Sequence, residues 1–307
     1  MSNGAAPRRR VLVVAPDFAP SSYPPALRIR FFARHLPEFG WEPTVLAIDP
    51  AYYEWDVDPE NEALLSDDLH VVRCPALPAS VTRSVGLGDL SARGLVHLWR
   101  AIRRLTSERR YDLLFLSVPP YYQALLGRWA YERLGIPYVV DYIDPWVSDY
   151  WKREPGASRF SKRAASAALA KKLEPICLRK AAHVTGVSKG TTDEIVARYD
   201  WLTPADATEI PYGGEPSDFD YLRTSPRKNP IFDPHDGSVH LSYVGRGGAD
   251  MVPALRAVFA AVREGLEQSP DVFGRLRLHF VGTTYAPDGE GRYQVLPVAE
   301  EEGVAHL

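Results

Sequence analysis

The sequence predicts an α/β protein built from two Rossmann-like domains, the second of them incomplete. Two strand–loop–helix starts, at residues 8–36 and 240–262, carry this prediction. Each has a short apolar strand, a loop of small residues or glycines, and a helix whose N-terminus faces the carboxyl end of the strand. Such a loop exposes backbone N–H groups beside the positive end of a helix, which suits a phosphate. We therefore expect two facing domains with a nucleotide-linked ligand between them.

The first domain alternates predicted strands with predicted helices. Residues 11–15 form a nearly continuous apolar run, which is typical of a buried parallel strand. Further strands are expected at residues 44–48, 69–72, 111–117, 138–141, 183–186 and 208–211. Helices are expected at residues 26–39, ended by Gly40, at 91–108, after Pro120, at 158–181 with a kink at Pro175, and at 189–199. This alternation indicates a parallel sheet. Residues 49–68 are acidic and aromatic without a clear period, and we expect a surface excursion there.

The second domain begins after a segment rich in Pro, Gly, Asp and Ser. A strand at 239–244, a helix at 250–268 and a strand at 277–281 are expected. Only 25 residues follow Gly282, whereas open sheets of this kind hold about five or six strands. We therefore expect that the chain is a fragment, or else that its second domain is unusually small. The predicted division is residues 1–212, a linker at 213–238, and residues 239–307.

Composition narrows the class of protein. A chain of 307 residues is long enough for about two domains. The net charge of -3 gives no argument for a nucleic-acid partner. The two cysteines, Cys74 and Cys177, lack metal-ligand spacing, and no cluster of His and Cys predicts a metal site. No apolar run approaches the roughly 20 residues of a membrane span, and the N-terminus lacks the apolar core of a signal peptide, so we expect a cytoplasmic protein.

Several stretches, in order, resemble the GT-B-fold glycosyltransferases of the retaining family 4 type. They are VLVVAPDFAPSSYPPALR, YDLLFLSVPPYYQALLGRWAYERLGIPYVVDYIDPW, AAHVTGVSKGTTDEI, IPYGGEPSDF and SYVGRGG. The chain differs from the family pattern in having Ile143 where an Arg is usual and Tyr212 where an Asn is usual. It also lacks the Lys that commonly follows the position of Arg246, and the family's acidic E-x7-E motif would lie beyond Leu307.

The resemblance implies an acceptor on the first domain, a nucleotide-diphosphate sugar on the second, and no metal or other cofactor. The expected reaction is retaining transfer of a sugar to a glycan or lipid-linked acceptor. For the donor phosphates, glycine lets the backbone approach and Arg offers a fork of donors. The candidates are Gly245, Arg246, Gly247 and Gly248. A simple strand-to-helix turn is the alternative for this loop.

The acceptor candidates follow strands of the first domain, where open α/β sheets bind ligands. Ser21, Ser22 and Tyr23 offer hydrogen bonds, and Arg28 in the first turns of the helix offers a positive charge, although it can equally be a solvated helix residue. Asp144 is the catalytic candidate, either orienting an acceptor hydroxyl or taking its proton. Trp146 offers a ring for stacking on a sugar. A helix cap with a packed aromatic residue is the alternative for the last pair, and Asp141 is expected to be structural.

Two predicted helices are basic and amphipathic, at residues 91–110 and 158–181. Such helices can lie on an anionic membrane surface, and they can also simply pack on a sheet. Two functions compete with glycosyl transfer. A sugar-nucleotide epimerase shares the two-domain architecture and needs no acceptor. A non-catalytic module would keep only glycan or partner binding.

Overall fold

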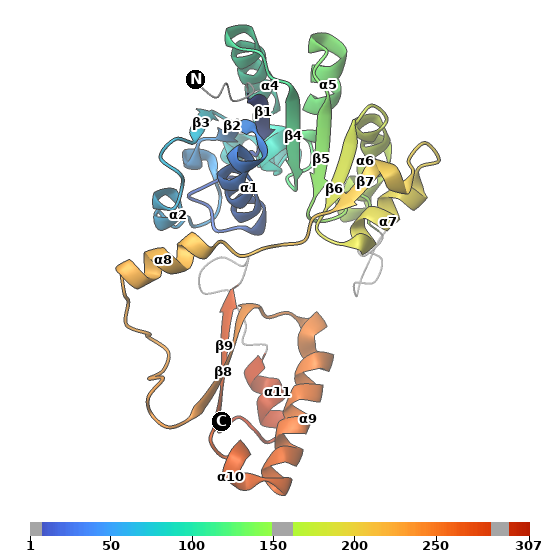
Figure 1. Ribbon diagram of the computed structural model, residues 1–307. Helices are drawn as coiled ribbons and strands as arrows, with labels where there is room; N and C mark the ends of the chain where they lie inside the picture. Colours follow the sequence, from blue (N-terminus) through green and yellow to red (C-terminus); the bar gives the residue numbers. More distant parts are fainter. Residues whose placement is uncertain (1–7, 149–161, 284–294) are drawn as a thin grey trace. The chain divides into compact units, whose positions relative to one another are not determined.

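The computed structural model describes residues 8–148, 162–283 and 295–307, and it contains two compact units (Figure 1). Unit 1 comprises Met1–Arg223 and unit 2 comprises Thr224–Leu307. The division falls inside the predicted linker at 213–238. The beginning of the basic helix predicted at 158–181 lies outside the described residues, because residues 149–161 are not among them.

Unit 1 contains a seven-stranded parallel sheet in the order β3-β2-β1-β4-β5-β6-β7. All seven predicted strands are confirmed, with small shifts at their ends. Their bounds are β1 Arg9–Val14, β2 Trp41–Ile48, β3 His70–Cys74, β4 Leu113–Val118, β5 Tyr138–Tyr142, β6 His183–Gly186 and β7 Ala207–Glu209. In register, Val14 lies beside Leu46 of β2 on one side and Leu116 of β4 on the other. The parallel α/β prediction is therefore correct.

The main helices of unit 1 also match the prediction. They are α1 Pro24–His35, α4 Leu90–Glu108, α5 Ala124–Leu134, α6 Lys162–Leu178 and α7 Lys189–Arg198. Helix α1 begins two residues earlier than expected, because proline is well suited to the first turn, where its missing N–H costs nothing. Gly40 ends the following turn with φ 79°, a conformation that glycine adopts readily. Helix α6 continues through Pro175 to Leu178. Short helices α2 Glu60–Ala63 and α3 Ala79–Thr82 were not expected.

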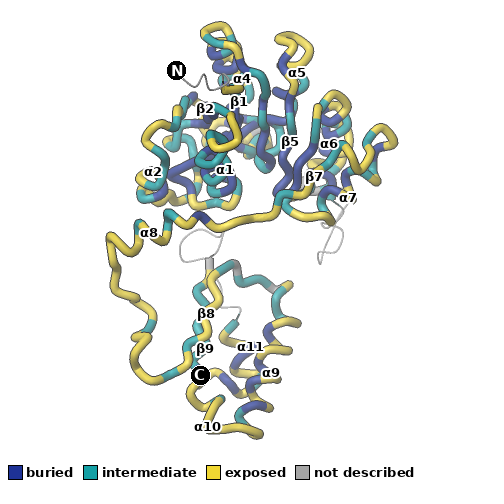
Figure 2. Tube along the Cα trace, in the orientation of Figure 1, coloured by how far each residue is buried: buried dark blue, intermediate teal, exposed yellow. Residues whose placement is uncertain are grey.

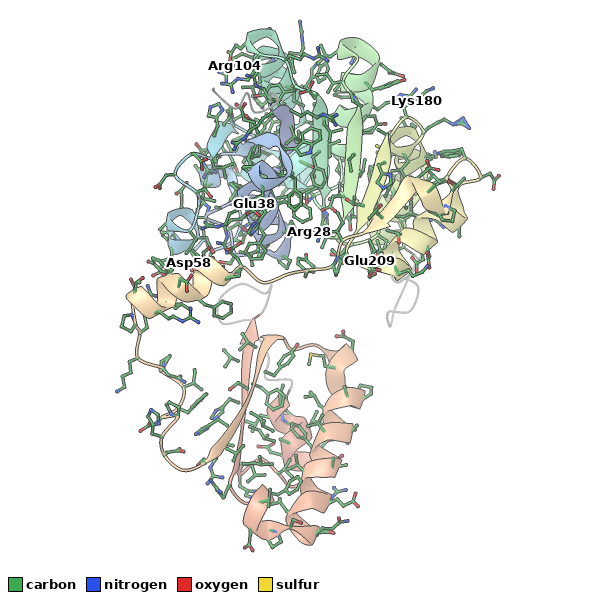
Figure 3. The ribbon with its side chains drawn as sticks, in the orientation of Figure 1. Arg28, Glu38, Asp58, Arg104, Lys180 and Glu209 are labelled. Carbon is green, nitrogen blue, oxygen red and sulfur yellow. The ribbon has the colours of Figure 1, made fainter. Side chains whose placement is uncertain are left out.

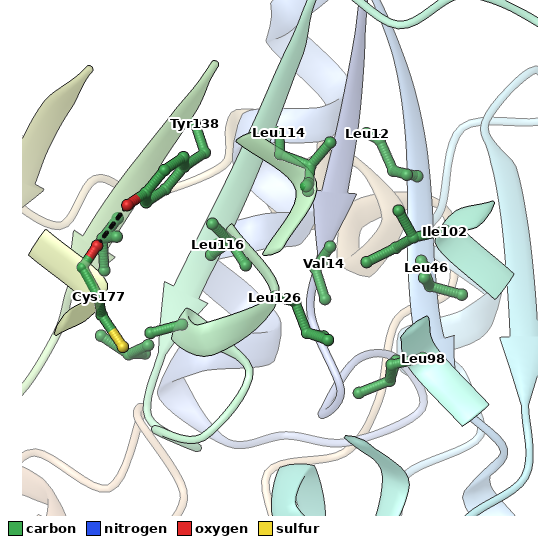
Figure 4. Close-up of a cluster of buried hydrophobic side chains, with 14 of the residues drawn as sticks. Leu12, Val14, Leu46, Leu98, Ile102, Leu114, Leu116, Leu126, Tyr138 and Cys177 are labelled. Atoms are coloured by element: carbon green, nitrogen blue, oxygen red, sulfur yellow. Dashed lines mark hydrogen bonds between the residues drawn. The ribbon is translucent and has the colours of Figure 1, made fainter. Parts of the chain in front are cut away.

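The two faces of the unit 1 sheet carry separate apolar clusters, because successive strand residues point to opposite faces. On one face, Val13 and Val45 pack with Ile29 and Ala33 of α1. The other face is covered by α4 to α7 (Figure 1), and its larger cluster is shown in Figure 4. There Leu12, Leu46, Leu114 and Leu116 are fully buried with residues of α4 and α5. The hydroxyl of Tyr138 donates to the Cys177 backbone carbonyl at 2.6 Å, which attaches α6 to β5.

A short helix in the predicted linker, α8 Pro216–Thr224, is held against α1. Arg30 makes two hydrogen bonds of 2.7 and 2.5 Å with the Asp218 carboxylate. Glu215 is buried and lies 2.7 Å from Nε2 of His35. Residues 213–223 are therefore part of unit 1, whereas the chain from 225 to 237 is mainly exposed (Figure 2).

Unit 2 contains two parallel strands, β8 Val239–Arg246 and β9 Leu276–Thr283. Helices α9 Val252–Gln268, α10 Pro270–Phe273 and α11 Val295–Glu301 complete its described part. Its core contains Leu255, Phe259, Val262, Leu276 and Val298. The predicted strand–helix–strand order is confirmed, and the two short helices, α10 before β9 and α11 after it, were not expected.

Candidate functional site

The carboxyl ends of β1, β4 and β5 lie next to one another at one edge of the unit 1 sheet. We call the last residues of these strands, such as Ser117 of β4, and the loops that follow them the carboxyl edge; the loops are residues 15–23, 119–123 and 143–147. Helix α1 leaves β1 toward one face, and α5 leaves β4 toward the other. Neighbouring strands whose connections diverge in this way form the switch point at which open α/β sheets bind ligands.

The three polar candidates after β1 are tied to the excursion at residues 49–68. The Ser21 hydroxyl accepts hydrogen bonds from the Tyr23 N–H at 3.3 Å and from Trp55 Nε1 at 3.2 Å. The Ser22 hydroxyl accepts from Asn61 Nδ2 at 2.9 Å. The Tyr23 and Trp55 rings stack with centroids 5.0 Å apart. Ser21 is buried, and Ser22 is the exposed member of the loop.

Arg28 lies one turn into α1 with its side chain 1% exposed. Its Nε and Nη2 atoms donate to the two Asp141 carboxylate oxygens at 2.8 and 2.9 Å. The Thr185 hydroxyl donates to the same carboxylate at 2.6 Å. Asp141 thus has the structural position expected for it. The Arg28 guanidinium, which the sequence analysis proposed for an anionic ligand, is thus paired with Asp141. The acceptor-binding role of Arg28 stays a prediction.

Asp144 and Trp146 follow β5, as predicted, but their environments differ. Asp144 is exposed, and partial desolvation raises the pKa of its carboxyl. Trp146 is 9% exposed and stacks on Tyr121 with ring centroids 5.6 Å apart. The Tyr121 hydroxyl in turn donates to the Pro145 carbonyl at 3.3 Å. The carboxylate therefore faces solvent, whereas the indole is largely enclosed by aromatic neighbours.

Three polar residues at this edge were missed by the sequence analysis. Asp17 is 4% exposed; burial raises the pKa of its carboxyl to about 7, although a hydrogen bond from Ser21 lowers it somewhat. Ser117 and Gln123 are also buried, and the Gln123 side-chain amide donates to the Ser117 backbone carbonyl. One signal was visible in the sequence, since Asp17 is the single charge between residues 11 and 27. A lone charge just beyond a buried strand lies where open α/β sheets bind ligands.

The excursion at residues 49–68 lies at the surface, as expected, but its aromatic residues brace the first loop. The Tyr53 hydroxyl accepts from the Phe18 N–H at 3.1 Å and lies 3.1 Å from the Ile48 carbonyl. Tyr53 also stacks on Trp55 with centroids 5.1 Å apart. These contacts fix the loop that carries Asp17 and Ser21.

A separate cavity of about 370 Å³ lies beside α1. Its walls are mostly aromatic and apolar, and they include Phe31, Phe32, Phe115 and Tyr212. Arg28 lies in its wall, with its guanidinium 4.5 Å from the Phe32 ring centroid. The cavity is therefore much less polar than the carboxyl edge.

In unit 2, the predicted phosphate loop is shorter than the sequence suggested. Gly245 and Arg246 are the last residues of β8 and pair with Gly282 and Thr283 of β9. The loop itself begins at Gly247, and the Gly248 carbonyl accepts from the Met251 N–H at 2.9 Å before α9 starts at Val252. A strand, a glycine loop and a helix N-terminus thus follow one another as predicted, and the phosphate role stays a prediction.

No helix in the described ranges is both long and apolar enough to cross a membrane. Within those ranges, no three or more His, Cys, Asp or Glu residues gather in a way that could hold a metal ion.

Residues 25–213 match the family model described as a glycosyl transferase 4-like domain, which is more than half of the chain. The chain belongs to this family. The family match contains Arg28, Asp144 and Trp146, whereas Ser21, Ser22, Tyr23 and the loop at 245–248 lie outside it.

Solved structures agree with the GT-B glycosyltransferase fold. Sucrose-phosphate synthase from Thermosynechococcus elongatus has a TM-score of 0.55 at 14% identity, over 97% of this chain and 69% of that one. The apo UGT2 of Phytolacca americana has a TM-score of 0.50 at 13% identity, over 91% and 73% of the two chains. At such identities the likeness shows the fold alone. A search of curated proteins found no match.

Proposed function

We propose that this glycosyl transferase 4-like protein moves a sugar from a nucleotide-diphosphate donor to a hydroxyl of a glycan or lipid-linked acceptor, with retention at the anomeric carbon. The observation that carries the proposal is the family match over residues 25–213. The carboxyl edge, whose polar and aromatic loops lie where open α/β sheets bind ligands, supports it independently.

The donor half of the reaction needs positive groups at the leaving diphosphate. In the transfer, the bond between the anomeric carbon and the phosphate oxygen breaks, and the diphosphate leaves with the electron pair. Backbone N–H groups at a helix N-terminus stabilise such a charge without reorganising. The loop at Gly247 and Gly248 leads through a 3-10 turn, Ala249–Met251, into the N-terminus of α9, and it supplies groups of this kind. Arg246, at the end of β8, is the side chain we assign to the diphosphate.

The acceptor half needs a group that takes a proton. The acceptor oxygen forms the new bond to the anomeric carbon, and its proton passes to a base. We assign this role to Asp144, which is exposed at the carboxyl edge and whose pKa is raised by desolvation. A carboxylate with a raised pKa is a stronger base. Ser22 and Tyr23 are assigned to hydrogen bonds with the acceptor.

The cellular setting belongs to the same proposal. Both cysteines are free and buried, which fits a reducing cytoplasm. Arg100, Arg103 and Arg104 are exposed on α4 at helical spacing and offer a basic surface for an anionic membrane. Sedimentation with phosphatidylglycerol vesicles, compared with phosphatidylcholine vesicles, tests this contact. Equal recovery in the two pellets would remove the membrane from the proposal.

Calorimetric titration of the chain with UDP, GDP and ADP sugars tests the donor assignment. We expect one nucleotide to bind, and we expect Arg246→Ala to weaken it at least tenfold, because an ionic hydrogen bond to phosphate is lost. Arg263→Ala is the matched control, since Arg263 is exposed on α9 and pairs with Glu302. An intact chain that binds none of the three nucleotides would refute the transferase proposal for this chain.

Product analysis separates transfer from its enzymatic rival. An epimerase would convert the sugar of the bound nucleotide without an acceptor. A transferase would release nucleoside diphosphate faster when an acceptor is added. If the protein converts the sugar nucleotide in the absence of an acceptor, the transferase proposal is wrong and the epimerase function takes its place.

A further inference from the structure

A buried carboxylate connects helix α6 with the ends of β5 and α7. Glu174 of α6 is 0% exposed, and its carboxylate accepts hydrogen bonds from three side chains. Arg198 Nη1 and the Tyr199 hydroxyl each donate to Oε2 at 2.6 Å. The Tyr142 hydroxyl donates to Oε1 at 3.3 Å. Because Tyr142 is the last residue of β5 and Arg198 is the last residue of α7, the network joins three elements of unit 1.

Arg198 also bonds the loop that carries Asp144. Its Nη2 donates to the Val147 backbone carbonyl at 3.1 Å, although the two residues are 51 positions apart. Figure 3 shows the side chains on this side of unit 1, which is marked by the labels of Lys180, just after α6, and Glu209, at the end of β7. A basic residue at the C-terminus of a helix usually complements the helix dipole. That role does not require bonds to a carboxylate of α6 and to a carbonyl of the loop after β5.

The same loop is held from the side of β4. The Ile143 N–H donates to a backbone carbonyl at the end of β4 at 2.9 Å. The Pro145 carbonyl accepts from the Tyr121 hydroxyl at 3.3 Å. Asp144 lies between these two attachments and is itself exposed. The bond from Arg198 therefore adds a second support, from α7, to a short loop whose carboxylate faces solvent.

Stability alone does not account for a buried ion pair at this place. Burying a carboxylate and a guanidinium is costly, and apolar residues of similar volume are often equally stable or more stable. Ala170 and Cys177 lie on the same face of α6 as Glu174 and belong to the larger apolar cluster. A leucine in place of Glu174 would extend that cluster, but it would remove the group that orients the Arg198 guanidinium. The ion pair is better explained by the loop that Arg198 holds.

We propose that Arg198 and Glu174 are positioning residues for Asp144. Arg198 holds the loop after β5 through the Val147 carbonyl, and Glu174 orients the Arg198 guanidinium. The inference rests on the proposed function, in which Asp144 takes the proton of the acceptor. The two residues act on the reaction through the loop, because a displacement of about 1 Å in a reacting group can lower the rate roughly 100-fold.

The charge-preserving variant Arg198→Lys tests the proposal in the full chain. An ammonium lacks the planar fork that bonds Glu174 and Val147 together, whereas the charge near Asp144 is unchanged. We expect amide hydrogen exchange in peptides that contain residues 143–148 to become about tenfold faster, as the loss of a hydrogen bond to a charged donor implies. Lys189→Arg is the matched control, since it makes the reverse exchange at the exposed start of the same helix. It should exchange like the wild type.

The titration of Asp144 gives a readout that a merely structural role would not move. NMR of the chain with carboxyl-¹³C-labelled aspartate, assigned with Asp144→Asn, measures it. Partial desolvation raises the pKa of this carboxyl, so a loosened and better hydrated loop should titrate at lower pH in Arg198→Lys than in the wild type. The Tyr121 hydroxyl does not interfere, because burial raises its pKa. An unchanged titration together with unchanged exchange of residues 143–148 overturns the proposal.

Glu174→Gln tests the second residue. Its amide keeps the shape of the side chain but loses the charge that orients Arg198, so exchange of residues 143–148 should become faster by a smaller factor than in Arg198→Lys. Exchange as slow as in the wild type would overturn the role of Glu174.

Transfer assays with UDP, GDP and ADP sugars and a panel of methyl glycosides connect the loop to the reaction. Arg198→Lys should lower kcat about tenfold and change the KM of the acceptor less than about twofold, because it displaces a reacting group without removing a binding contact. If Asp144→Asn transfers at the full rate, the base assignment falls and the positioning role falls with it. If Asp144→Asn abolishes transfer while Arg198→Lys changes neither kcat nor the Asp144 titration, the positioning role is wrong and the proposed function stands.

Discussion

Unit 1 and unit 2 are built from the same strand–loop–helix start, yet they bury it to very different degrees. In unit 1, helices cover both faces of a seven-stranded sheet, and Leu12, Val14, Leu114 and Leu116 are completely buried. In unit 2, helices cover one face of a two-stranded sheet, and Leu241 and Val244 are 52% and 71% exposed. An apolar strand sequence therefore predicts a strand in both units, but only the number of neighbouring elements decides whether that strand is buried.

This difference in burial indicates which unit contributes most of the stability and which can enclose polar groups. Burying a large apolar side chain contributes about 1.5–3 kcal/mol, so unit 1 carries most of the apolar stabilisation. It also supports buried polar groups that a thin unit could not enclose, such as Arg28, Asp17 and Ser117. In unit 2, the glycine loop at Gly247 and Gly248 follows a strand whose apolar side chains are largely exposed.

The largest expected effect comes from the buried ion pair of unit 1. Arg28→Ala leaves the Asp141 carboxylate, which is 0% exposed, with Thr185 as its remaining side-chain partner. Removing one partner of a buried pair typically costs about 3–5 kcal/mol. Urea unfolding followed by tryptophan fluorescence measures the loss in unit 1, because all seven tryptophans lie in residues 41–201.

Arg104→Ala is the control for this variant, since the pair that Arg104 makes with Glu108 is exposed and its loss should change stability little. A loss below about 1 kcal/mol for Arg28→Ala would show that the pair is not enclosed in solution. Unit 1 would then differ less from unit 2 in how well it encloses polar groups.

A matched pair of apolar truncations compares the two sheets directly. Leu116→Ala removes a completely buried side chain from β4 and should cost about 3 kcal/mol, through lost burial and the cavity left behind. Val244→Ala changes an exposed side chain of β8 and should stay within about 0.5 kcal/mol. Fluorescence reports the first variant, and hydrogen exchange of peptides from residues 239–283 reports the second. A cost above 1 kcal/mol for Val244→Ala would mean that its side of the sheet is covered in solution.

The sequence predicted the sheet well because its strands are buried on both faces and therefore read as continuous apolar runs. It also predicted that the residues after β1 and β5 would share one edge, which parallel strands require. It did not predict which polar groups pair. Arg28 and Asp141 are 113 residues apart, and nothing local in either helix or strand specifies that contact.

Two other features could not be predicted, for different reasons. Helix α8 lies in a segment whose Pro and Gly content favours loops, and long-range ion pairs with α1 override that local preference. The burial of Ser117, near the end of β4, and of Gln123 arises from packing, since neither residue type is unusual at its position. Only the position of Asp17 in an apolar run was visible beforehand.

A smaller effect, dependent on pH, is expected at Asp17. The pKa of this carboxyl is raised from 3.8 to about 7 by burial, which a hydrogen bond from Ser21 only partly offsets. Between these values the unfolded chain releases a proton that the folded chain keeps, so the wild type loses stability as pH rises through this window. Asp17→Asn cannot ionise, and its stability relative to the wild type should rise by about 2 kcal/mol from pH 5 to pH 8.

Urea unfolding at both pH values measures this change, again through tryptophan fluorescence. The Tyr53 hydroxyl, which lies near Asp17, does not titrate in the window, because burial raises its pKa. A difference between variant and wild type that is the same at pH 5 and pH 8 would place the Asp17 carboxylate in water. Unit 1 would then lack the enclosed carboxyl that distinguishes it from unit 2.

The smallest effect concerns the boundary between the two units. Asp218→Asn weakens the paired hydrogen bonds that hold α8 against Arg30 of α1, and we expect residues 212–224 to lose about 1 kcal/mol of protection. Hydrogen-exchange mass spectrometry measures this locally. Asp220→Asn is the control on the same helix, because its exposed carboxylate bonds Arg223 one turn away. If the two variants exchange alike, α8 is not held by Arg30 and unit 1 ends nearer residue 212. If only Asp218→Asn exchanges faster, the ion pair between Arg30 and Asp218 holds α8 in unit 1, although the sequence of this segment predicts a linker.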